Sequence, residues 1–116
     1  MKGMMTSIAI RTQFKGLHKY ENAPVEVAYL RDLHRHVFYV EVEMRVETTE
    51  RDLEFILVRN ALDDYLEHKA QFEETFSCER MANEICLFLI KQYGERSMKC
   101  CVYEDNENGG CVYYEF

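Results

Sequence analysis

The most constraining feature of the sequence is a regular alternation of side-chain type from His34 to Val46. The even positions are apolar or carry an imidazole, and they are His34, His36, Phe38, Val40, Val42, Met44 and Val46. The odd positions between them include Arg35, Glu41, Glu43 and Arg45. Successive side chains of a β-strand point to opposite faces of a sheet. The period of two therefore predicts a long strand with one buried and one solvated face, and it puts both imidazoles on the same face.

Three further segments read as strands. The even positions of residues 8–14 are apolar or Thr, which predicts a first strand ahead of the long one. Residues 98–104 alternate, and residues 111–116 are rich in aromatic and β-branched side chains. The segment between them, 105–110, consists of turn-forming residues. These features predict a hairpin at the end of the chain.

Two helices are predicted between the strand pairs. Apolar residues recur at helical spacing over residues 54–68. A second helix is expected to begin at Ser77, a residue type favoured at the N-cap, and to end at Gly94. The order strand, strand, helix, helix, strand, strand predicts an α+β fold. We expect one domain over residues 1–116, because a chain of 116 residues can bury a single modest core.

Composition narrows the range of partners and compartments. The net charge of −7 argues against nucleic-acid binding, which needs concentrated Lys and Arg. The apolar runs are too short to span a bilayer. The five cysteines are an odd number without a Cys-x-x-Cys pair, which disfavours a disulfide framework and favours a reducing compartment. We therefore expect a soluble cytoplasmic protein with neither nucleic acid nor membrane as partner.

Three of the four histidines suggest a metal site. His34 and His36 share one strand face, and His18 on a neighbouring strand would complete a set of three imidazoles. Three neutral imidazoles with an open fourth position are typical of catalytic Zn²⁺. A single histidine is more often a hydrogen-bonded core or surface residue, so the hypothesis depends on the set rather than on His18 alone.

Five short motifs in this order resemble the 6-pyruvoyl-tetrahydropterin and 6-carboxy-tetrahydropterin synthases of the tunnelling fold. They are Phe14-Lys-Gly-Leu-His18, His34-Arg-His36, Leu66-Glu-His68, Ser77-Cys-Glu-Arg-Met-Ala82 and Val102-Tyr-Glu104. The resemblance implies a four-stranded antiparallel sheet with both helices on one face. It also implies subunit rings, commonly trimers stacked as hexamers, with active sites between subunits.

The resemblance also implies roles for individual residues. The zinc ligands of the family match His18, His34 and His36. The glutamate that anchors the pterin ring matches Glu104, and Glu79 in the opening of the second helix is a further substrate-binding candidate. The acid-histidine pair of the family matches Glu67 and His68, which would shuttle protons.

Two departures bear on the reaction. Leu30 stands where the family has its catalytic cysteine, and Arg35 replaces the usual glycine between the paired histidines. If turnover persists, we expect proton transfer to depend on His68 with Glu67. Cys78 would assist, because the dipole at a helix N-terminus favours a partly ionised thiol.

Each role has a structural alternative. Glu67 and His68 fit a solvated helix end, and Glu104 fits a surface acid bordering a turn. Cys78 fits a buried inert cysteine.

The expected function is that of a zinc-dependent lyase acting on 7,8-dihydroneopterin triphosphate or a related reduced pterin, in pterin or 7-deazaguanine precursor synthesis. Lys15, Lys19 and Arg31 lie near the ligands in sequence and would meet phosphate. The alternative is a metal-containing module that binds a pterin-like or purine-like ring without turnover, for sequestration or regulation.

Overall fold

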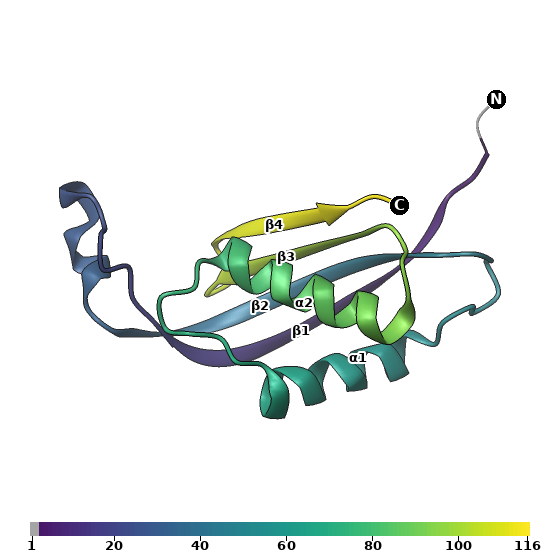
Figure 1. The fold of residues 1–116 in the computed structure, drawn as a ribbon, viewed down its shortest axis with the longest axis horizontal. Coiled ribbons are helices and arrows are strands. Elements are labelled where there is room, and N and C mark those ends of the chain that lie inside the picture. The colour runs from purple at the N-terminus through teal and green to yellow at the C-terminus, as the bar shows by residue number, and fades with distance from the viewer. Residues whose placement is uncertain (1–2) are drawn as a thin grey trace.

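Four antiparallel strands form one sheet in the order β1-β2-β3-β4 (Figure 1). A computed structural model describes residues 3–116, so residues 1 and 2 of the expected domain lie outside it. The strands are β1 (Thr6–His18), β2 (His34–Val46), β3 (Met98–Glu104) and β4 (Asn108–Tyr114). The long strand predicted from alternation is confirmed at both ends. The hairpin turn is shorter than expected, because Gly109 and Gly110 already pair with β3.

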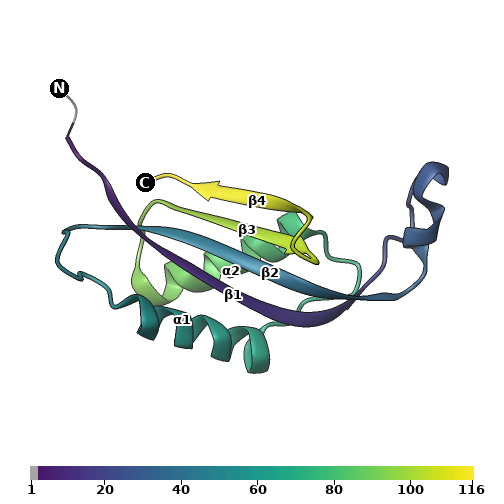
Figure 2. The same cartoon turned by 180° about the vertical axis from the view of Figure 1, so that it is seen from behind.

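Both helices cover the same face of this sheet. Helix α1 (Phe55–Asp64) packs on β1, and helix α2 (Cys78–Tyr93) packs on β3 and β4. Figure 2 shows the opposite face of the sheet without a covering helix. The α+β class and the four-stranded antiparallel sheet predicted from the sequence are therefore confirmed. Within residues 3–116, no helix has the length and apolar composition needed to cross a membrane.

The ends of the helices follow from local chemistry. The Ser77 side chain accepts a hydrogen bond from the Arg80 N–H at 3.1 Å and caps α2, as predicted. Gly94 ends α2 with φ 88°, a conformation that glycine adopts without steric cost. The first helix departs from the prediction for residues 54–68, because a wider π-type turn, η2 (Tyr65–Lys69), follows α1. The sequence pattern cannot show this change, since both helical forms keep the apolar residues on one side.

The core lies between the sheet and the two helices. Its fully buried members are apolar side chains at even positions of β2 and β3 and on the inner faces of α1 and α2, including Val42, Met44, Val58, Leu62, Ala82, Ile85, Cys86, Leu89, Cys100 and Val102. This face of the sheet carries the apolar set that the alternation predicts, while charged side chains lie on the other.

Replacing Ile85 by Ala is expected to lower the free energy of unfolding by about 2–5 kcal/mol, because the lost methyl groups leave a cavity in a fully buried site. Leu87 lies on the exposed side of the same helix. Leu87→Ala should change stability by no more than about 0.5 kcal/mol. Urea unfolding of both variants checks this, and equal losses would contradict the packing described.

The hairpin of β1 and β2 projects past β3 and β4, and it carries the short helical segment η1 (Val25–Arg31) at its far end (Figure 1). The guanidinium of Arg31 donates two hydrogen bonds to the Ala23 carbonyl, at 3.0 and 2.8 Å, which closes this loop. The segment holds Leu30, and it was not predicted from the sequence.

One disulfide joins Cys101 to Cys111. The two residues face each other directly in the β3–β4 ladder. The expectation of reduced cysteines is therefore wrong for this pair. Neither the odd number of cysteines nor the missing Cys-x-x-Cys spacing is informative here, because strand register makes the two residues neighbours. The cysteines therefore no longer favour a reducing compartment. A cytoplasmic location stays a prediction. Cys78, Cys86 and Cys100 are free and buried.

Candidate metal centre

Strand register brings the three predicted histidines together. His18 ends β1 directly opposite His34, which begins β2. His36 lies two residues further along β2 and therefore on the same face as His34. One ring nitrogen from each histidine lies within 4.8 Å of the other two. The rings of His34 and His36 are closest, with 4.5 Å between centroids.

Three buried ring nitrogens in this cluster have no hydrogen-bond partner. They are Nδ1 of His18, Nε2 of His34 and Nε2 of His36. A buried polar atom without a partner costs about 1–3 kcal/mol, so three at one point call for an explanation. Neutral imidazole nitrogens are common metal ligands. The His18, His34 and His36 group could hold a metal ion, and the unpartnered nitrogens fit that use.

The other nitrogens of two rings are held by acceptors. His34 Nδ1 lies 2.7 Å from the Asp32 carbonyl oxygen, and His36 Nδ1 lies 2.7 Å from Asp105 Oδ2. A carbonyl and a carboxylate can only accept, so each Nδ1 donates here, and each Nε2 is the ring nitrogen left to bind a metal. Such outer partners fix the ring orientation of metal-binding histidines.

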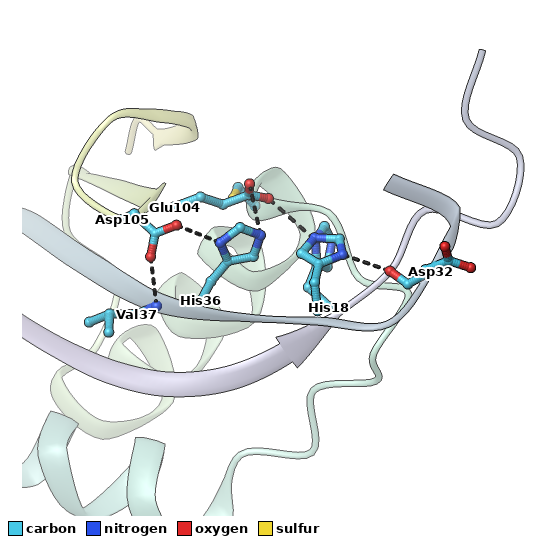
Figure 3. A network of polar contacts seen from close by, with 8 residues as sticks. His18, Asp32, His36, Val37, Glu104 and Asp105 are labelled. Carbon is cyan, nitrogen blue, oxygen red and sulfur yellow. Dashed lines mark hydrogen bonds and ion pairs between the residues drawn. The ribbon is translucent and has the colours of Figure 1, made fainter. Parts of the chain in front are cut away.

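Asp105 is the residue that sequence reasoning missed, because it was assigned only to the turn. It has φ 51°, in the left-handed region that Asp tolerates. This conformation directs the carboxylate back to β2, where Oδ1 accepts from the Val37 N–H at 3.0 Å (Figure 3). The hydrogen bonds from His36 and Val37 hold the pKa of Asp105 below its ordinary value. An acid immediately after Glu104 at a strand end is the only signal in the sequence.

Glu104 lies beside two of the imidazoles. It ends β3, and its Oε1 is 3.3 Å from His18 Nδ1 while its Oε2 is 3.3 Å from His36 Nε2 (Figure 3). The structure therefore places Glu104 against two members of the histidine cluster, His18 and His36.

Cys78 contacts Glu104 and so lies next to the histidine cluster. Its thiol lies 3.9 Å from Glu104 Oε1. Burial raises the pKa of Cys78 to about 12, and the charges of Glu104 and Glu79 add to the rise. The thiol is thus neutral near pH 7, and the expectation of partial ionisation is wrong. The helix N-terminus favours the thiolate, but burial and two carboxylates outweigh it.

Glu79 lies in the first turn of α2, next to β4. A Cβ at Gly110 would come within 2.5 Å of Glu79 Oε1, so the glycine leaves room for this carboxylate. Glu79 is exposed and makes no hydrogen bond or ion pair with the described histidines.

His68 and Glu67 are not brought to the cluster. Both lie on the π-type turn η2, with side chains 63% and 74% exposed, and they face each other at 3.8 Å. Among residues 3–116, neither forms a hydrogen bond or ion pair with His18, His34 or His36. Within one chain, Glu67 and His68 are therefore separate from the candidate metal ligands.

The expected phosphate contacts are also dispersed. Lys19 pairs with Glu21 at 3.1 Å, and Arg31 is engaged by the Ala23 carbonyl. Lys15 and Arg35 line a groove of about 540 Å³ whose other lining residues are Gly16, Leu17, His36, Val37 and Asp105. Because His36 and Asp105 are among the lining residues, this groove reaches the edge of the histidine cluster.

Comparison of the sequence with protein-family models and with curated protein sequences found no match. The case for a metal centre therefore comes from the geometry of this chain.

Replacing Asp105 by Asn is expected to weaken zinc binding by about 10- to 100-fold, because the amide no longer orients His36 as a carboxylate does. Asp64→Asn, a change of an exposed acid on α1, should leave zinc affinity unchanged. Competition with a chromophoric chelator measures both affinities. Equal affinities in the two variants would show that Asp105 has no positioning role.

Proposed function

We propose that this protein is a zinc-dependent lyase of the 6-pyruvoyl/6-carboxy-tetrahydropterin synthase type, built on the tunnelling fold. Its substrate would be 7,8-dihydroneopterin triphosphate or a closely related reduced pterin. The observation that carries the proposal is the convergence of three unpartnered imidazole nitrogens beside the carboxylate of Glu104.

The residues of the site divide into two tasks under this proposal. His18, His34 and His36 would hold zinc, which when bound polarises the side-chain oxygens of the substrate and lowers their pKa. Glu104 would accept hydrogen bonds from the amino and N–H groups of the ring. The position of Glu104 next to the candidate zinc ligands supports this assignment. A ring held by Glu104 would place the side chain of the pterin close to the zinc.

Proton transfer is assigned to His68 with Glu67. Since these residues do not reach the histidine cluster of their own chain, the proposal requires a second copy to supply them. Two open sheet edges support association, because the outer edges of β1 and β4 leave backbone groups unpaired among the described strands. We accordingly propose a homo-oligomer, a trimer or hexamer, with sites between subunits.

Incubation of zinc-loaded protein with 7,8-dihydroneopterin triphosphate, followed by mass spectrometry of the products, tests the proposal. We expect a tetrahydropterin that has lost the triphosphate. The His34→Ala, His36→Ala protein serves as the control and should give none. Unchanged substrate after incubation with fully zinc-loaded protein would contradict the lyase assignment.

A second candidate is a binding module that keeps the metal and the ring without turnover. It is favoured by Leu30 at the position of the family's cysteine and by the neutral thiol of Cys78. Tight binding of a reduced pterin by zinc-loaded protein that forms no product would support this alternative.

A further inference from the structure

Glu104 faces the nitrogens that would bind a metal ion. Its two carboxylate oxygens point to different histidines, with Oε1 at 3.3 Å from His18 Nδ1 and Oε2 at 3.3 Å from His36 Nε2 (Figure 3). Neither contact has hydrogen-bond geometry, and both ring nitrogens remain without a partner. A carboxylate thus lies beside the ring nitrogens that would bind a cation.

The surroundings hold Glu104 at this place. It is the last residue of β3, where the ladder pairs it with Phe38 of β2, and Asp105 then anchors the chain to Val37. Glu104 and Asp105 lie on opposite sides of the His36 ring. Asp105 contacts Nδ1 of this ring, and Glu104 faces Nε2. The Cys78 thiol donates toward Oε1 from the helix side.

We propose that Glu104 is a fourth protein ligand to the metal ion when no substrate is bound, and that a pterin ring takes this carboxylate away from the metal. The inference rests on the proposed function. Carboxylate oxygens are ordinary zinc ligands alongside imidazole. A ring whose amino and N–H groups were met by both oxygens of Glu104 would compete with the metal for this carboxylate.

This exchange makes the state of the metal depend on the substrate. With Glu104 bound, four protein ligands close the site, as in structural zinc sites. With Glu104 on the ring, a coordination position opens next to the substrate side chain. Because coupling between two ligands is reciprocal, a ring that removes a metal ligand must bind less tightly to metal-loaded protein than to metal-free protein.

Co²⁺ reports the ligand set through its visible absorption, and it accepts the same imidazole and carboxylate ligands as zinc. We expect Glu104→Gln to alter the spectrum of Co²⁺-loaded protein and to weaken zinc binding by about tenfold or more. The matched control is Glu107→Gln, an exposed acid in the same turn, which should keep the wild-type spectrum and affinity.

The outcomes separate the two proposals. Suppose that wild-type protein binds Co²⁺ and zinc and that Glu104→Gln has the same spectrum and the same zinc affinity. This result would overturn Glu104 as a ligand and leave the proposed function standing. Wild-type protein that binds neither metal would overturn both.

A measurement on wild-type protein applies even if Glu104→Gln fails to fold. The probe is 7,8-dihydropterin, which has the ring but no side-chain hydroxyls to contact the metal. We expect it to bind chelator-treated protein about 5-fold or more tightly than zinc-loaded protein. Equal or tighter binding to the zinc-loaded form would overturn the exchange. Absence of binding to either form would overturn the exchange and the pterin proposal together.

Discussion

Replacing both His34 and His36 by Ala is expected to abolish zinc binding. Two of the three imidazole ligands are then lost, and the remaining imidazole, His18, is too few to hold zinc. We expect wild-type protein purified without chelators to contain about one zinc per chain, and the double variant to contain less than about one tenth of that amount. Elemental analysis of dialysed protein measures both.

The matched control is His68→Ala, which removes the one histidine that lies outside the cluster and is largely exposed. It should retain the wild-type zinc content. Because His34 and His36 line the end of the sheet rather than its centre, thermal unfolding of the zinc-free double variant should resemble that of chelator-treated wild type. Full zinc occupancy in a folded double variant would place the metal elsewhere.

The His68→Ala variant is expected to lose product formation while it keeps zinc and ring binding. A positioned general acid-base residue contributes about 10²- to 10⁴-fold, so the rate constant kcat should fall by that factor. Lys69→Ala changes the next residue, which is equally exposed, and should leave kcat near the wild-type value. Steady-state turnover of 7,8-dihydroneopterin triphosphate gives the comparison.

A mixing experiment tests whether a second copy supplies His68. Neither His68→Ala protein nor the His34→Ala, His36→Ala protein should turn over substrate alone. Subunits mixed under conditions that allow exchange should recover part of the activity. Some sites then take His34 and His36 from the His68→Ala chain and His68 from the other chain. Light scattering that shows a monomer at tens of micromolar, or mixtures that stay inactive, would exclude a shared site.

Much of the histidine cluster is predictable because it depends on strand periodicity. The alternation from His34 to Val46 fixes the face of His34 and His36, and the antiparallel register then brings His18 opposite His34. Glu104 is indicated only by the family resemblance, and its place opposite Phe38 comes from the β2–β3 pairing. The class of fold and the capped start of α2 at Ser77 are likewise local properties of the sequence.

Other features depend on tertiary contacts that no local pattern encodes. The left-handed conformation of Asp105 turns a residue of the hairpin into a partner of His36. The Cys101–Cys111 disulfide follows from register across the hairpin. The thiol of Cys78 is neutral because burial and nearby carboxylates outweigh the helix dipole, and a sequence shows only the dipole.

Diffraction from crystals of zinc-loaded protein at the zinc absorption edge shows where the protein holds its metal. The anomalous signal locates the metal without reference to any assumed ligand. We predict one strong peak per chain, bounded by the ring nitrogens of His18, His34 and His36. A fully loaded crystal with its peak at the cysteines or at exposed acids, and none among these three rings, would contradict the account.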